Sequence, residues 1–188
     1  MPMRKNLDRR VQRTRLALMS AFIELVLTRG YEPLTTGDIC RKANVGRSTF
    51  YLHYPSKAAL LAESMRNPSN QMAACIDGNP TPQQLVPLLD HFREQRTVNR
   101  TFFADPIRSL WVKSLAALIE PRLPARTGGS RSDLPRSLTA IMIAEMQIAL
   151  VTHWLTYKPA LKAELIGATL IANTRAMLAA FGCSERTR

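Results

Sequence analysis

The stretch that most constrains this chain is residues 35–57, TTGDICRKANVGRSTFYLHYPSK, which predicts two short helices joined by a tight turn. Thr35 and Asp38 form the Thr-x-x-acid pattern of a capping box. Leu34 and Ile39 occupy the two positions of a hydrophobic staple, one residue before the cap and four residues after it. These signals together predict that a helix begins at Thr35.

The turn after this helix is marked by Asn44, because Asn tolerates the left-handed conformation in which many helices end. Ala43 lies one turn beyond Ile39 on the same face and is small enough for another helix to approach closely. Gly46 can start the next helix as a permissive N-cap, although it has no side chain for capping. A helix, a turn of about three residues and a second helix make a helix-turn-helix.

In a helix-turn-helix the first residues of the second helix face the major groove of DNA, so Arg47, Ser48 and Thr49 are candidates to read base edges. The guanidinium fork of Arg47 can bond two acceptors on a guanine, and the Thr49 methyl group can contact a thymine methyl. Side chains of the types that hold phosphate follow in the same stretch. They are Tyr51, His53, Tyr54 and Lys57.

Here the sequence resembles the tetracycline-repressor (TetR) family of bacterial transcription regulators, most closely over residues 14–61. The matching marks are Ala-Phe-x-Glu-Leu at 21–25, Arg-Gly-Tyr at 29–31, Thr-Thr-x-Asp-Ile at 35–39 and Thr-Phe-Tyr-x-His-Tyr at 49–54, followed by Ser-Lys at 56–57. The resemblance implies that Arg47 and Thr49 read bases. It also implies that phosphates are held by Thr36, Tyr51, His53 and Lys57.

Two positions depart from the commonest family pattern. Asn44 stands where a Gly is frequent, and Gly46 replaces a frequent Ser or Thr cap, which removes one hydroxyl from the turn. A helix-turn-helix can also be only a way of packing two helices, with Tyr and His as ordinary boundary residues. The capping box, the basic and hydroxyl cluster and the family pattern together favour DNA binding over that interpretation.

Charge points to the same region. The chain has 188 residues, 46% of them hydrophobic, which suffices for one sizeable core or for a small domain plus a larger one. Its net charge of +12 indicates a polyanionic partner. Residues 1–66 hold 12 of the 26 Lys and Arg but only 5 of the 14 Asp and Glu. The positive charge is therefore concentrated on the segment with the motif.

Other classes of protein are not indicated. Three cysteines without a C-x-x-C pair, and an N-terminus without an apolar signal core, predict a cytoplasmic protein. We expect no membrane partner, because Glu145, Gln147 and His153 interrupt the longest apolar run before it reaches about 18 residues. No metal-ligand spacing, phosphate loop or nucleophile motif occurs. We therefore expect neither catalytic residues nor a metal or cofactor.

The rest of the chain predicts helices. Residues 1–10 carry four basic residues without an apolar pattern, which predicts a flexible arm that either adds DNA contacts or is merely solvated. Asn67-Pro68 marks the boundary between domains of residues 1–66 and 67–188, although Pro68 could also only kink a helix. No convincing alternating β-branched run occurs, so we expect an all-α protein with nine helices. They are predicted at residues 11–29, 35–44, 46–54, 58–65, 83–95, 98–103, 106–120, 136–157 and 159–181, with a loop at 122–135.

The second predicted domain contains aromatic, Met and His side chains that could line an adaptable apolar pocket. They are His91, Phe102, Phe103, Trp111, Met142, Met146 and Trp154. Each can equally be a core residue, and it is the family resemblance that implies a pocket for a small effector. The helix at 136–157 is apolar over more than one face and needs partners on several sides. The resemblance implies that the last two helices pair with their copies in a four-helix dimer interface.

These observations predict a homodimeric, ligand-responsive regulator, a repressor that an unidentified small-molecule effector releases from a palindromic operator in double-stranded DNA. The alternative is a helical interaction protein whose basic N-terminal region binds nucleic acid without sequence preference. A preference among DNA sequences separates the two.

Overall fold

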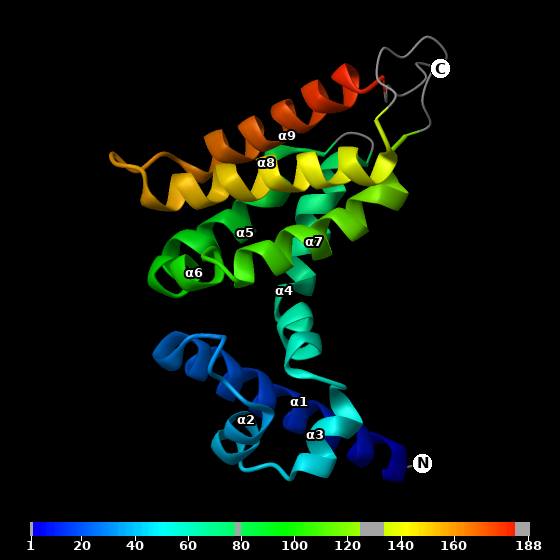
Figure 1. The fold of residues 1–188 in the computed structure, drawn as a ribbon, viewed down its shortest axis with the longest axis vertical. Coiled ribbons are helices and arrows are strands. Elements are labelled where there is room, and N and C mark those ends of the chain that lie inside the picture. Colours follow the sequence, from blue (N-terminus) through cyan, green and yellow to red (C-terminus); the bar gives the residue numbers. More distant parts are fainter. Residues whose placement is uncertain (1, 78–79, 125–133, 183–188) are drawn as a thin grey trace. The chain divides into compact units, whose positions relative to one another are not determined.

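The computed structural model describes residues 2–77, 80–124 and 134–182, and every regular element within them is a helix (Figure 1). The prediction of an all-α protein with nine α-helices is confirmed for this part of the chain. The helices are α1 (Pro2–Arg29), α2 (Thr36–Ala43), α3 (Arg47–His53), α4 (Lys57–Ala73), α5 (Pro82–Glu94), α6 (Arg96–Phe102), α7 (Ile107–Ile119), α8 (Arg136–Thr156) and α9 (Ala163–Ala180), with the 3-10 helices η1 (Ala74–Ile76) and η2 (Glu120–Arg122).

The chain divides into two compact units, Met1–Met65 and Arg66–Arg188. The first unit contains α1, α2, α3 and the beginning of α4, and its core takes at least one large apolar side chain from each of these helices. Those that are fully buried include Leu18, Phe22, Ile39, Phe50 and Leu60. Phe50 points inward, because the face of α3 that carries it packs on this core.

The second unit is a helical bundle in which α7 packs on α8, α5 packs on α9, and α8 and α9 lie side by side (Figure 1). Its centre is apolar apart from a few buried polar side chains, Ser69, Thr139, Gln147 and Thr174. Gln147 of α8 is fully buried, and its Nε2 donates to the Met72 carbonyl at 3.3 Å and to the Thr174 hydroxyl at 3.1 Å. These bonds join α8 to the end of α4 and to α9.

Three helix boundaries differ from the prediction by four residues or more. α4 continues through Pro68 to Ala73, because the burial of Ser69 and Met72 in the second unit outweighs the roughly 3 kcal/mol that a proline costs inside a helix. α9 begins at Ala163 instead of residue 159, and the indole N–H of Trp154 donates to the Leu161 carbonyl in the segment before it. Most of the loop predicted at 122–135 lies outside the described residues.

The third difference concerns the N-terminus. The expectation of a flexible arm at residues 1–10 is wrong for the backbone that the structure describes, since α1 is helical from Pro2. Residues 2–10 are rich in Arg, Lys, Leu and Met, which are strong helix formers, so an established helix extends through them without an apolar face.

Among the described residues, α8 is long and apolar enough to cross a membrane by length and composition alone, with a mean hydropathy of 1.4. We expected the polar residues of this helix to keep its apolar run below a membrane-spanning length. That expectation was too strict, because the mean hydropathy of a long window stays high when it includes a few polar residues. Half of the stretch is buried inside the unit, and the core helix of a soluble protein satisfies the same criterion.

Lys57, the first residue of α4, ties the first unit together. Its Nζ donates to the carbonyl of Tyr31 at 2.8 Å and to that of Glu32 at 3.2 Å, both in the turn that follows α1. The same ammonium lies 4.2 Å from the centroid of the Tyr31 ring, within the range of a cation–π interaction. The start of α4 is thus fastened to the turn between α1 and α2.

We predict that Lys57→Ala lowers the free energy of unfolding by about 1–2 kcal/mol, because two carbonyls lose a charged donor and the ring loses its cation. Denaturant unfolding of the purified protein measures this loss. Lys42→Ala is the matched control, since Lys42 pairs with Glu24 at 2.6 Å on the exposed surface and such pairs contribute less than about 1 kcal/mol. If both variants lose the same small free energy of unfolding, Lys57 does not stabilise the first unit in the way that we infer.

Candidate nucleic-acid interface

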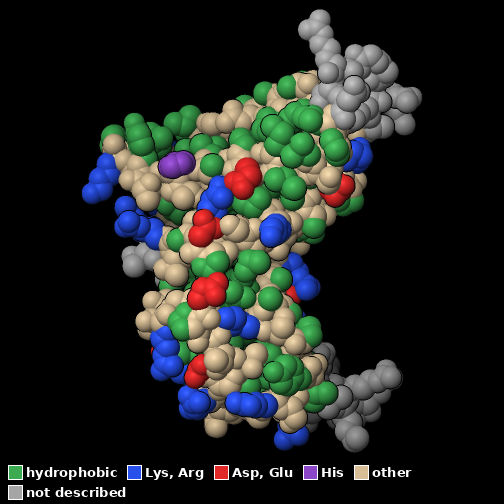
Figure 2. Space-filling view, viewed as in Figure 1, with side chains coloured by type: hydrophobic (Ala, Val, Ile, Leu, Met, Phe, Trp, Pro, Cys, Tyr) green, Lys and Arg blue, Asp and Glu red, His purple; other side chains and the backbone are tan. Residues whose placement is uncertain are grey.

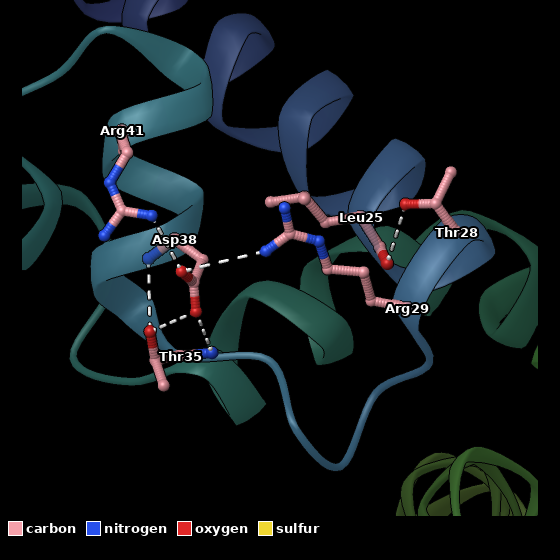
Figure 3. A network of polar contacts seen from close by, with 6 residues as sticks. All are labelled: Leu25, Thr28, Arg29, Thr35, Asp38 and Arg41. Carbon is pink, nitrogen blue, oxygen red and sulfur yellow. Dashed lines mark hydrogen bonds and ion pairs between the residues drawn. The ribbon is translucent and has the colours of Figure 1, made fainter.

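The first helix of the motif, α2, begins at the predicted capping box (Figure 3). Thr35 has extended backbone angles, φ −104° and ψ 158°, and its Oγ1 accepts from the Asp38 backbone N–H at 3.1 Å. In return, the Asp38 carboxylate accepts from the Thr35 backbone N–H at 3.1 Å. Leu34 and Ile39 are both buried, as expected of staple residues.

Asp38 also joins α2 to its surroundings. Its carboxylate accepts from Arg41 Nη1 at 3.1 Å and lies 4.0 Å from Arg29 Nη1 at the end of α1 (Figure 3). The hydrogen bond from the Thr35 hydroxyl, together with the backbone bond and Arg41, holds the pKa of Asp38 below its ordinary value. The carboxylate therefore stabilises the fold at neutral pH, and this contribution is lost as the pH falls through the lowered pKa.

The turn has the predicted geometry. Asn44 adopts the left-handed conformation, with φ 54° and ψ 47°, and its N–H donates to the Arg41 carbonyl. The next N–H, from Val45, donates to the Cys40 carbonyl at 3.0 Å, which completes the helix C-cap. Gly46 is extended and precedes α3 without a side-chain cap. The two helices of the motif are therefore joined as the sequence predicts.

The exposed face of α3 carries most of the predicted DNA contacts. Arg47, Ser48 and Tyr51 are exposed, whereas Thr49 and His53 are half-buried. Thr36 at the start of α2 approaches this face, because its hydroxyl lies 3.3 Å from that of Tyr51. The structure thus brings the first turn of α2 and the exposed side of α3 together on one surface.

Two of the predicted contact residues lie elsewhere. Tyr54 is buried, and its hydroxyl accepts from Arg15 Nε at 3.4 Å. Arg15 in turn pairs with Glu63 at 2.7 Å, so that α1, the end of α3 and α4 are linked. The ammonium of Lys57 is engaged by the turn after α1. In the described structure both side chains hold elements of the first unit together.

The prediction did not include Leu52, whose side chain is 83% exposed on α3. It lies one helical turn after Ser48, among the residues expected to meet DNA. The sequence signal that could have identified Leu52 is its position between Tyr51 and His53, two residues that were predicted to contact DNA. Further exposed basic residues lie on α1 and α2, and Figure 2 shows Lys and Arg side chains on the surface of the first unit. They include Arg9, Arg10, Arg13, Arg41 and Lys42.

The aromatic residues predicted to line a pocket lie in the core of the second unit. Trp111 packs against Phe103 with ring centroids 4.5 Å apart, and both rings contact Phe92. The indole N–H of Trp111 donates to the buried Ser69 hydroxyl at 2.8 Å. Phe102 and Trp154 are also buried. These side chains therefore fill space between helices.

The other predicted pocket residues are more accessible. Met142 and His91 are exposed and Met146 is half-buried. A cavity of about 180 Å³ lies at a different place in the second unit, beside Gln71, Cys75, Gln84 and Leu85. Burial raises the pKa of the Cys75 thiol to about 12, so this thiol is uncharged at neutral pH. Among the described residues, no group of three or more His, Cys, Asp or Glu could hold a metal ion.

Comparison with known proteins agrees with this geometry. Residues 18–64 match the family described as "Bacterial regulatory proteins, tetR family". An uncharacterized HTH-type transcriptional regulator of Bacillus subtilis (strain 168), YxbF, is 48% identical over 58 residues. That match covers 30% of this chain and only 15% of the relative's length.

Two solved structures extend the likeness to the whole chain. A TetR transcriptional regulator from Streptococcus agalactiae 2603V is 27% identical, with a TM-score of 0.59, over 93% of this chain and 99% of its own. A TetR-family regulator from Streptomyces coelicolor A3 shares the fold, with 17% identity, a TM-score of 0.64 and 89% and 96% of the two chains covered. The helix-turn-helix region, residues 18–64, therefore matches the tetR family of bacterial regulatory proteins, and the chain shares its fold with solved TetR regulators.

Proposed function

We propose that the protein is a transcriptional regulator that binds a specific DNA operator as a homodimer. The observation that supports this most directly is the surface made by the first turn of α2 and the exposed side of α3, where Arg47, Ser48, Thr36 and Tyr51 lie together. A seven-residue α3 is long enough to present its first turn to base edges in the major groove.

The contact residues have two different tasks in this proposal. Arg47 and Thr49 read bases, while the hydroxyls of Thr36 and Tyr51 and the imidazole of His53 contact phosphates. The free backbone N–H groups in the first turn of α2 add a partial positive charge beside those hydroxyls. Phosphate contacts fix the position of α3 on the duplex, and only the base contacts distinguish sequences.

The regulator is proposed to act in the cytoplasm, as a repressor whose dimer covers a near-palindromic operator. A dimer with twofold symmetry places its two α3 helices on equivalent half-sites, which is why the operator should be palindromic. The competing proposal is a helical interaction protein that binds nucleic acid through charge alone. It predicts equal affinity for all DNA sequences at a given salt concentration.

Arg47→Ala tests the assignment. It should weaken binding to the preferred operator by about 1–3 kcal/mol and binding to unrelated DNA much less, because a bidentate base contact is lost. Competition binding against an operator selected from random DNA measures both affinities. Arg93→Ala, which removes an Arg paired with Asp90 on α5, is the matched control and should leave both unchanged. If Arg47→Ala lowers both affinities equally, Arg47 grips the backbone and the proposed reading helix is misassigned.

Dimerisation is supported by apolar side chains that the second unit leaves exposed. Leu138, Ile141 and Met142 lie close together along α8, and Leu165 on α9 is 53% exposed. One chain leaves these groups in water, whereas a second copy packed on α8 and α9 would cover them.

We therefore expect a particle of about twice the 21.1 kDa chain mass in sedimentation at micromolar concentration. Ile141→Glu should shift this particle to the monomer, since it places a charge in the apolar contact. Leu16→Glu changes an exposed leucine of α1 and should leave the dimer intact. A wild-type monomer under these conditions would remove the dimer from the proposal.

A small-molecule effector is the remaining part of the proposal, supported by the cavity of about 180 Å³ beside Cys75 in the second unit. A ligand can release DNA only if it binds the DNA-incompetent arrangement more tightly, and the coupling is reciprocal. Compounds that raise the melting temperature should therefore bind more weakly when operator is present. Equal affinities with and without operator would exclude allosteric control by those compounds.

A further inference from the structure

Gly37 is the second residue of α2 and lies next to the proposed reading residue, Arg47. A glycine inside a helix is less favourable than alanine by up to about 1 kcal/mol. The backbone does not require glycine at this position, because its φ lies outside the left-handed region that excludes most other residues. The cap does not require it either, since Thr35 and Asp38 form the capping box. The reason for a glycine must lie in the space around it.

That space is occupied by the guanidinium group of Arg47. A Cβ atom at position 37 would lie 2.8 Å from Arg47 Nη2 and 3.6 Å from Arg47 Cζ, and the first distance is too short for two non-bonded atoms. At Gly46, by contrast, the nearest atom to an added Cβ would be 3.8 Å away. The side chain of Arg47 therefore leaves α3 and rests on the first turn of α2, where another residue would place its own side chain.

This resting place matters because of the charges around it. The N-terminal end of α2 carries a partial positive charge, so it does not bind a guanidinium strongly. Arg47 is nevertheless exposed, and its guanidinium lies against position 37, next to Thr36 in the chain. Its long side chain lies in the space that Gly37 leaves and remains accessible to an anionic partner. A side chain at position 37 would turn the guanidinium away from α2.

We propose that Gly37 is a specificity-determining position, which acts by leaving the space that directs Arg47 toward DNA. The inference rests on the proposed function, because it requires a DNA sequence that Arg47 helps to distinguish. Gly37 makes no contact with bases in this proposal. It is a positioning residue, and its effect on DNA binding exists only through Arg47.

A double-mutant cycle tests this dependence. Gly37→Ala should weaken binding to the preferred operator by roughly threefold or more, the lower part of the range for coupled residues in contact, and change binding to unrelated DNA little. In the Arg47→Ala background the same substitution should change operator affinity less than about twofold. Gly37→Ser places a Cβ atom at the same point as Gly37→Ala and should therefore have the same effect on operator affinity.

Thermal unfolding of the same variants separates positioning from stability. Because alanine is the better helix former, Gly37→Ala should melt at the wild-type temperature or above it, so a loss of operator affinity cannot be attributed to unfolding. The contact that is displaced is the end of a flexible side chain, which can move without disturbing the core.

The outcomes distinguish this inference from the function on which it rests. If the wild-type protein shows no preference among DNA sequences, the proposed function fails and this inference with it. If the wild-type protein is selective and Arg47→Ala lowers that selectivity, two results would overturn the role of Gly37 alone. These are wild-type behaviour of Gly37→Ala on both DNAs, and an equal loss of operator affinity in both backgrounds.

Discussion

The reciprocal hydrogen bonds between Thr35 and Asp38 determine where α2 begins, and the rest of the motif depends on that position. Successive residues of a helix differ by about 100° in direction, so a start displaced by one residue would turn Ile39 out of the core. The same displacement would move the Asn44 turn and rotate the exposed face of α3. Because Asp38 also meets Arg29 and Arg41, the capping carboxylate fixes α2 against the end of α1 as well.

The motif could be predicted from the sequence because its signals act over a few residues. The cap joins positions three apart, and the left-handed turn needs only the tolerance of Asn44 for a positive φ. Tyr54 and Lys57 show the limit of such signals. Their side chains were expected to face DNA, yet the partners that hold them, Arg15 and Tyr31, lie 39 and 26 residues away. Sequence spacing contains no information about contacts of that kind.

The second unit shows the same limit on a larger scale. Apolar periodicity predicted its helices, since a helix must bury one face wherever it packs. Whether Trp111 lined a pocket or filled the core depended on Ser69, 42 residues earlier, which accepts its indole N–H. The extent of α4 was also undetermined, because a proline that ends an isolated helix is tolerated once the following turn is buried. Tertiary packing decided each of these cases.

The buried amide of Gln147 has a consequence for how the helices of the second unit can be arranged. It supplies a donor to the Met72 carbonyl near the end of α4. Within the described residues its Oε1 has no hydrogen-bond partner, so the group is not the most stable choice for an apolar centre. Apolar surfaces alone would allow α8 to slide along its neighbours by a turn and still bury similar area. A slide of that length, about 5.4 Å, would strand the amide among methyl groups. The hydrogen bonds of Gln147 therefore favour one register of α4, α8 and α9 over others that would bury a similar apolar area.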